Sequence, residues 1–436
     1  MLALERPRSL VEAAAAPDAR GAVDDWVRSQ HVNLRRAVRA LQPFTEATFG
    51  SGPAAPSPAQ LEAVNALVAH LARRLGQVDT QLARAAERTA ATDEDTRLAR
   101  FQQLKGRGQR ALQAVEKIWE FYFELFGQRL SPYADQLLAA DRVATDCYQA
   151  VYLHLGRARS IPSPRPLSYI DTGFSPATFR RGVRMSAIGR NRNPFPLVVF
   201  PRSRLVSPWT LGAVPHEVGH NLQSDLGLWL TLRDVLRGEL ESSGFHPLVV
   251  KTFTRWHKEM FADLIGVLLI GPAFVHSLMD VVGAARTKVV TFQPGGAHPT
   301  PYLRVPLNLL LLRRIGFEAE AARIDAAWQR LYPRALRARL PEPIAGSFEA
   351  AADTAVSVIC FRRYAELGGQ SLVQTVAFSR RDQALVEEGA ARLARNRNTG
   401  ILPSRFLIAA ARTAFDRRLA PPDAIARNFY QALVRR

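Results

Sequence analysis

The sequence predicts a mainly α-helical protein with a small β-sheet, an α+β fold class. Most of the chain is rich in Ala, Leu and Arg, with apolar residues at the three- and four-residue spacing of amphipathic helices. Strand-like patterns are confined to residues 167–200, and nearly every segment after Leu205 is helical in pattern. Hydrophobic residues make up 47% of the chain, which is typical of a folded globular protein rather than a disordered one.

Changes in composition divide the 436 residues into four predicted segments. Residues 1–58 form an N-terminal arm that ends in a Gly-, Pro- and Ser-rich linker, and residues 59–160 form a helical hairpin or bundle. Residues 161–340 form the core domain. A Pro-rich break near 338–347 separates the core from a C-terminal helical segment, 341–436.

The start of the 59–160 segment has the pattern of a coiled-coil helix. Ser57 and Pro58 suit its cap and first turn, and apolar residues then alternate at spacings of three and four: Leu61, Val64, Val68, Leu71, Leu75, Val78 and Leu82. Helices around 112–126 and 133–155 are expected to pack against it. This helical segment is a candidate surface for a protein partner.

The charge of the chain is strongly basic, with 58 Lys and Arg against 39 Asp and Glu and a net charge of +19. Such a balance favours anionic partners. However, the arginines are scattered through helices, as in proteins of GC-rich bacterial genomes. Dense clusters such as Arg180-Arg181 are short and lack interleaved aromatic residues. Nucleic acid is therefore not a predicted partner.

Cysteine usage and hydropathy predict a cytoplasmic protein without a membrane span. Cys147 and Cys360 are far apart, which indicates neither a disulfide framework nor a thiolate metal site. The first twenty residues carry charges where a secretory signal would have its apolar core. The longest apolar run, 264–275, is shorter than the roughly 20 residues that span a bilayer.

The apolar run FPLVVF, residues 195–200, is predicted to be an edge or near-edge strand. Pro194, Pro196 and Pro201 lie at its ends, and proline cannot donate a hydrogen bond to a central ladder. Because an exposed strand edge can pair with an extended peptide, this strand is a candidate for binding substrate backbone. A purely structural strand is the alternative.

The strongest functional motif is HEVGH at residues 216–220. On a helix His216 and His220 lie on one face, so both imidazoles can bind one cation, with Glu217 beside the open coordination position as a general base. Zn²⁺ is the predicted cofactor, because two imidazoles and a carboxylate form a three-ligand catalytic site. The alternative is a surface helix with two unrelated histidines. Flanking apolar residues favour a packed helix, which Pro215 either begins or kinks.

The third ligand is expected in the segment KEMFAD, residues 258–263. Glu259 and Asp263 are four apart on a predicted helix, so that Glu259 can bind the metal while Asp263 accepts a hydrogen bond from a ligand histidine. A solvated carboxylate pair is the alternative, which the apolar neighbours disfavour. His257 is a rival ligand, but it is two residues from Glu259 and therefore faces away from it.

These two motifs, together with HPTPYLR at residues 298–304, resemble the gluzincin metallopeptidases, in particular the HtpX and CAAX-prenyl-protease group. The resemblance covers about residues 195–310 and implies a zincin-like core flanked by helical segments. It also implies the roles given above for residues of the first two motifs. That group is built around transmembrane helices, which this sequence lacks, so membrane-bound or prenylated substrates do not follow from the resemblance.

The resemblance further implies that His298 and Arg304 stabilise the oxyanion of the reaction. Tyr302 is an additional candidate for this role, since a phenol can donate a hydrogen bond to a developing negative charge. An aromatic residue that anchors a Pro-rich turn is the alternative for Tyr302.

Two functions follow from this pattern. The first is a zinc-dependent bacterial-type metallopeptidase that hydrolyses peptide or protein substrates, with Glu217 as the general base. The second is a catalytically silent zincin-fold protein that acts as a binding or regulatory module through its helical regions.

Overall fold

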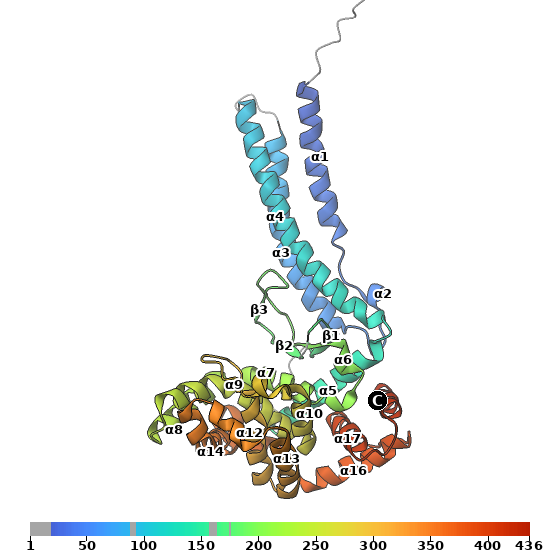
Figure 1. Cartoon of the computed structure of the whole chain (residues 1–436). Coiled ribbons are helices and arrows are strands. Elements are labelled where there is room, and N and C mark those ends of the chain that lie inside the picture. The colour runs from blue at the N-terminus through green and yellow to red at the C-terminus, as the bar shows by residue number, and fades with distance from the viewer. Residues whose placement is uncertain (1–18, 88–92, 157–163, 174–175) are drawn as a thin grey trace, which may run out of the picture. The chain divides into compact units, whose positions relative to one another are not determined.

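The computed structural model describes residues 19–87, 93–156, 164–173 and 176–436 (Figure 1). Helix accounts for 71% and strand for 5%, which confirms the predicted mainly helical class with a small amount of sheet. The chain divides into two units, one comprising Met1–Pro43 and Asn65–Glu120 and the other comprising Phe44–Val64 and Phe121–Arg436. The four predicted segments remain predictions, and their boundary at 160 falls outside the described residues.

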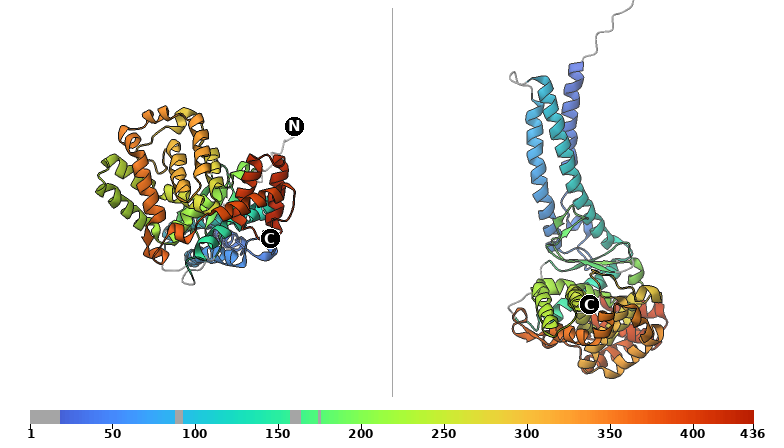
Figure 2. Two further views of the ribbon diagram at one scale, coloured as in Figure 1. Left: turned by 90° about the horizontal axis from the view of Figure 1, so that it is seen from below. Right: turned by 60° about the vertical axis from the view of Figure 1, so that its left-hand side comes forward.

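The first unit is built from three long helices that run side by side (Figures 1 and 2). They are α1 (Ala19–Ala40), α3 (Pro58–Ala86) and α4 (Glu94–Gly127), of which α3 and α4 continue into the second unit. The predicted helix start is confirmed, because α3 begins at Pro58. The packed faces meet in a small apolar core formed by Val27, Leu34, Leu82, Phe101 and Leu104.

Helix α1 falls within the predicted N-terminal arm, where no helix was expected. Val23, Val27, Leu34 and Val38 all belong to its packed face and lie at near-helical spacing. The polar and charged residues between them weaken the pattern, so this helix depends on packing against α3 and α4 for its stability.

The second unit is a helical assembly around one continuous apolar core, which includes residues from Leu137 to Leu433. Its helices before the metal motif are α2 (Glu46–Phe49), α5 (Ala134–Tyr152) and α6 (Arg202–Leu205). The remaining helices are α7 (Ala213–Asp225), α8 (Leu228–Ser242), α9 (Pro247–Ile270), α10 (Pro272–Val282), α11 (Arg286–Val289), α12 (Pro301–Arg314), α13 (Glu318–Leu331), α14 (Glu342–Val356), α15 (Leu372–Thr375), α16 (Arg380–Ala394), α17 (Ser404–Asp416) and α18 (Pro422–Val434).

The main sheet has three strands in the order β1 (Leu167–Ile170), β5 (Leu197–Phe200) and β2 (Ala177–Phe179). Strand β1 pairs with β5 in parallel, with Leu167 opposite Leu197, and β2 pairs with β5 antiparallel, with Ala177 opposite Val199. Two short hairpins, β3 (Arg184–Met185) with β4 (Asn191–Arg192) and β6 (Arg363–Tyr364) with β7 (Gln370–Ser371), complete the strands.

FPLVVF was predicted to be an edge or near-edge strand, and the edge position is wrong, because β5 is the central strand of this three-stranded sheet. The reason is that Pro194, Pro196 and Pro201 all lie outside the paired residues Leu197–Phe200, so no ladder hydrogen bond is lost. The edge strand nearest the metal motif is β2. It is tied to α7 by a hydrogen bond of 2.7 Å from the Asn221 amide to the Thr178 hydroxyl.

Buried polar contacts hold the other edge of the sheet. The carboxylate of Asp141 on α5 forms an ion pair of 2.6 Å with Arg129 and accepts a hydrogen bond of 2.6 Å from the backbone N–H of Ser168 on β1. Arg129 also donates to the Ser168 carbonyl group. These contacts anchor β1, and through β5 they position β2 beside α7.

One described helical stretch, Glu342–Phe361, is long and apolar enough to cross a membrane, with a mean hydropathy of 1.4. It comprises α14 and the π-helical turn that follows. Half of this stretch is buried inside the structure, as is usual for the core helix of a globular protein.

Candidate metal centre

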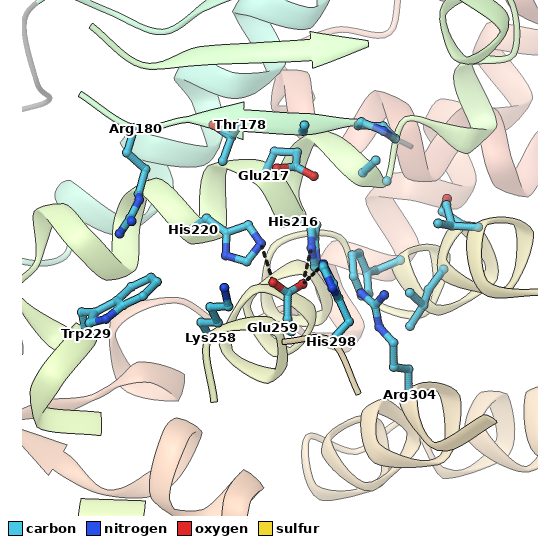
Figure 3. Close-up of a pocket in the computed structure, with 18 residues that line it drawn as sticks. Thr178, Arg180, His216, Glu217, His220, Trp229, Lys258, Glu259, His298 and Arg304 are labelled. Atoms are coloured by element: carbon cyan, nitrogen blue, oxygen red, sulfur yellow. Dashed lines mark ion pairs between the residues drawn. The ribbon is translucent and has the colours of Figure 1, made fainter. Parts of the chain in front are cut away.

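Helices α7 and α9 bring the predicted metal ligands together. His216 and His220 project from successive turns of α7, and Glu259 projects from α9 toward both rings (Figure 3). One ligand atom from each of these three residues lies within 4.8 Å of the other two. Helix α7 begins at Ala213, so Pro215 lies in its first turn, where proline needs no kink.

The separations within this triad match those of ligands around one ion. Nε2 of His216 lies 3.6 Å from Oε2 of Glu259, and Nε2 of His220 lies 3.6 Å from Oε1. These distances are too long for strong hydrogen bonds. Tetrahedral zinc with bonds of about 2.0–2.2 Å separates its ligand atoms by roughly 3.4 Å. The triad therefore has a spacing suited to a zinc ion.

Burial of the Glu259 carboxylate supports the same interpretation. Its side chain is only 5% exposed, and Oε2 has no hydrogen-bond donor among the described residues. A buried carboxylate oxygen without a donor is costly, and a cation is the partner that satisfies it. The donor set of two imidazoles and one carboxylate fits Zn²⁺.

A buried carboxylate on α9 orients the first histidine. Oδ1 of Asp263 lies 2.9 Å from Nδ1 of His216, which leaves Nε2 directed toward Glu259. Asp263 in turn accepts two hydrogen bonds from Arg304, of 2.9 and 2.7 Å. Such a chain fixes the tautomer and the orientation of a metal-binding imidazole.

The structure places Arg304 differently from its predicted role at an oxyanion. Its guanidinium lines the cavity but is paired in two-pronged fashion with Asp263, which is only 1% exposed. Asn308, one helical turn later on α12, donates a hydrogen bond to the Arg304 carbonyl. In this structure Arg304 therefore supports the carboxylate that contacts His216, and its role at an oxyanion stays a prediction.

His298 and Tyr302, the other two predicted oxyanion residues, are separated by the structure. Nε2 of His298 lies 3.5 Å from Oε2 of Glu259, on the loop before α12, and its side chain is 69% exposed. Tyr302 lies within α12, two residues before Arg304, and therefore faces the opposite side of the helix. It lines a different cavity with Arg337 and Phe348. Only His298 is brought to the triad.

Glu217 lines the same cavity as the triad, and its side chain is buried. Figure 3 shows its carboxyl group on the side of α7 that faces β2, above the two imidazole rings. Burial raises the pKa of Glu217, while the neighbouring His216 and His220 act to lower it. The predicted rival ligand His257 is absent from this cavity. Its Nδ1 lies 2.8 Å from the Thr254 carbonyl oxygen, and its ring packs against Trp229.

The metal-free triad has a distinctive charge state. Burial alone lowers the pKa of His216, but the nearby carboxylates of Asp263 and Glu259 outweigh burial and raise it to about 10. Burial raises the pKa of Asp263, but Arg304 and His216 outweigh this effect and lower it to about 2. The two histidines likewise hold the pKa of Glu259 below its usual range. Without a metal, a proton on His216 supplies the positive charge that these carboxylates require.

We therefore expect zinc uptake at about pH 7 to release about one proton from His216, because the metal binds the neutral imidazole. Zinc affinity should rise with pH until the pKa of His216, about 10, is reached. Calorimetric titration with zinc in buffers of different ionisation enthalpy measures the released protons. A binding enthalpy that does not depend on the buffer would contradict this charge state.

Close packing of α7 on α9 depends on Gly219. A Cβ atom at this position would lie 2.7 Å from Ile265 Cγ2 and 3.0 Å from Ala262 Cα, the latter a backbone atom of α9. Glycine is thus required because the two backbones approach closely between the two histidines. The same approach allows Glu259, one turn before Ala262 and Asp263, to reach both rings.

Gly219→Ala is expected to destabilise the fold by about 1–3 kcal/mol through overpacking, and to weaken zinc binding by moving Glu259 away from the histidines. Gly238→Ala on α8 is the matched control, because no atom lies within 4 Å of its added Cβ. That control should stabilise the protein by about 0.5–1 kcal/mol, as alanine does in a helix. Denaturant unfolding and zinc titration of both variants measure these effects. Equal stability of the two variants would contradict the packing argument.

The triad lies in a cavity of about 390 Å³. Sequence reasoning missed several residues that line it, among them Thr178 and Arg180 from the region of β2, Trp229 from α8 and Lys258 from α9. Arg180 was considered only as part of a short basic cluster. No local pattern in the sequence shows that these four residues face one cavity.

No protein-family model, curated protein or solved structure matches this chain. The function must therefore be argued from the motifs and from the geometry of this cavity.

Proposed function

We propose that the protein is a zinc-dependent metallopeptidase with a zincin-like core of the gluzincin type. The observation that carries this proposal is the convergence of His216, His220 and Glu259 on one point, with the Asp263–Arg304 pair behind His216. The triad opens into a cavity that also contains Glu217. Three protein ligands and an accessible fourth position are the arrangement of catalytic rather than structural zinc sites.

In the proposed reaction a zinc ion held by the triad would act as a Lewis acid that makes a water molecule more acidic and polarises the substrate carbonyl group. Glu217 accepts a proton from the attacking water and delivers it to the leaving nitrogen. Asp263 keeps Nδ1 of His216 protonated, so that Nε2 remains free to bind the metal. His298, which is exposed beside Glu259, is placed to donate a hydrogen bond to the oxyanion.

Strand β2 supports peptide as the substrate. Within the described residues it is the outer strand of the β1–β5–β2 sheet, and Ala177 and Thr178 line the cavity of the triad. An extended peptide can add to such an edge through backbone hydrogen bonds, in register with its scissile bond beside the metal ligands. The sequence suggested that residues 195–200 bind the substrate backbone. We now propose this role for β2 instead.

The proposal is tested by digestion of casein and of a peptide library with the purified full-length chain. Cleavage is expected, and removal of zinc with a chelator should abolish it until one equivalent of zinc is restored. Failure of the zinc-loaded protein to cleave any member of the library would contradict peptidase activity.

A further inference from the structure

One end of the metal cavity carries two cationic side chains on one aromatic ring. Cζ of Arg180 lies 4.3 Å from the centre of the Trp229 ring, and Nζ of Lys258 lies 5.9 Å from it. The three residues come from the end of β2, from α8 and from α9. Figure 3 shows them together on the His220 side of the triad. We call Arg180, Lys258 and Trp229 the cationic end of the cavity.

The charges of Arg180 and Lys258 are not neutralised by ion pairs. Among the described residues neither side chain forms a salt bridge or a hydrogen bond with an acidic group. Burial lowers the pKa of Arg180, and the charge of nearby Asp225 opposes this effect without forming an ion pair with Arg180. All three residues of the cationic end are only partly exposed. Partly buried cations without a counter-ion favour binding of an anion.

The remaining charges around the triad are committed elsewhere. Arg304 is paired with Asp263, and Glu259 faces the two metal-binding histidines. The other carboxylate that lines the cavity, Glu217, lies on the side of α7 that faces β2, and among the described residues it forms no ion pair with Arg180 or Lys258. When a divalent ion is bound, positive charges therefore outnumber carboxylates in the cavity. An excess of one sign of charge in a low-dielectric cavity concentrates ligands of the opposite sign.

The other end of the cavity, near the start of α7, is lined mainly by apolar side chains. Gly212, one helical turn before His216, packs so closely on α10 that a Cβ atom there would lie 2.5 Å from Ser277 Cβ. Helix α10 contributes Phe274, Leu278 and Val281 to the lining at this end. The triad thus lies between a cationic end and an apolar end.

We propose that Arg180 and Lys258, held by Trp229, bind a carboxylate of the peptide substrate close to the bond that is cut. This proposal rests on the proposed peptidase function and adds a substrate class, namely peptides with a carboxylate on one side of the scissile bond and an apolar residue on the other. An internal Asp or Glu side chain and the C-terminal carboxylate of a peptide supply the same chemistry.

Binding is measured by calorimetry with the zinc-loaded Glu217→Gln protein, which prevents turnover during the titration. The probes are peptides of equal length, blocked at both ends, that differ only by Glu, Gln or Lys at one position next to an apolar residue. A fourth peptide contains Gln and has a free C-terminal carboxylate. The Glu peptide, the free-carboxylate peptide or both should bind about tenfold or more tightly than the blocked Gln peptide, as for other charge-assisted contacts. The stronger of the two identifies the source of the carboxylate.

Charge reversal at Arg180 gives the decisive comparison, because this residue is remote in sequence from the metal ligands. In the same background, Arg180→Glu should remove the preference for a carboxylate and favour the Lys peptide instead. Arg184→Glu is the matched control, since Arg184 is exposed and does not line the cavity. It should leave the ranking of the peptides unchanged.

The outcomes separate this inference from the proposed function. Cleavage of peptides without a carboxylate preference would overturn the inference and leave the peptidase proposal standing. Tight binding of carboxylate peptides that depends on Arg180, without cleavage by the wild type, would support the inference and overturn the peptidase proposal. An unchanged ranking in Arg180→Glu, or no binding of any peptide, would overturn the inference.

Discussion

Replacing Glu217 by Gln is expected to lower peptide hydrolysis by about 10²–10⁴-fold, the usual contribution of a general base. The introduced amide keeps the shape of the side chain but accepts no proton from water at neutral pH. The ligands His216, His220 and Glu259 are untouched, so the variant should still bind one zinc ion. Rates of peptide cleavage and zinc content, measured on the same preparation, test both statements together.

Glu241→Gln, at the exposed end of α8, is the matched control for this variant. It removes the same charge at a distance from the cavity and should preserve both activity and zinc. If Glu217→Gln cleaved peptides as fast as the wild type, or kept the full biological activity of the protein, the general-base role would be contradicted. That outcome would support the alternative of a catalytically silent zincin-fold protein that acts through its helical regions.

The second large effect is expected from Glu259→Gln, which should lower zinc affinity by more than about 100-fold. Changing a residue that merely supports a metal ligand costs about 10–100-fold, and here a charged ligand itself is removed. The same substitution removes the negative charge that faces the two partly exposed imidazoles. Competition with a chromophoric zinc chelator measures the affinity, and Glu241→Gln again provides the control. Unchanged affinity would remove Glu259 from the ligand set.

The parts of the site that sequence could predict are those set by helix geometry. His216 and His220 share a face because residues four apart on a helix are neighbours, and the same rule placed Asp263 behind Glu259. The coiled-coil pattern after Pro58 also depends only on neighbouring residues, and the helix that it predicted is confirmed. Such features depend on the chain near each residue and not on the tertiary fold.

Most features that depend on the tertiary arrangement could not be predicted from the sequence. The order of strands made β2 rather than β5 the outer strand beside the cavity, although the prolines around 195–201 suggested otherwise. Tyr302 was grouped with His298 because a phenol can donate a hydrogen bond to an oxyanion, yet Tyr302 lines another cavity. The cationic end is formed by residues from three separate elements, so that no spacing rule relates them.

Arg304 shows that the place of a motif can be predicted while the contacts of its side chain cannot. His298 and Arg304 of the HPTPYLR segment lie at the candidate metal centre, and the arginine donates two hydrogen bonds to Asp263, a contact that the sequence did not predict. The long side chain of an arginine near the start of a helix can reach either a carboxylate on a neighbouring helix or a substrate in the cavity. Which contact Arg304 makes depends on how α9 packs against α12, and the sequence does not show this packing.

The central claim is that two imidazoles from α7 and one carboxylate from α9 bind a single zinc ion. Zinc K-edge X-ray absorption of the zinc-loaded protein, together with its metal content, tests this claim most directly. The account predicts one zinc per chain, with only nitrogen and oxygen ligands at about 2.0–2.2 Å, two of them imidazoles, and a changed spectrum in Glu259→Gln. A protein that binds no zinc, or a spectrum with sulfur ligands at about 2.3 Å that Glu259→Gln leaves unchanged, would contradict it.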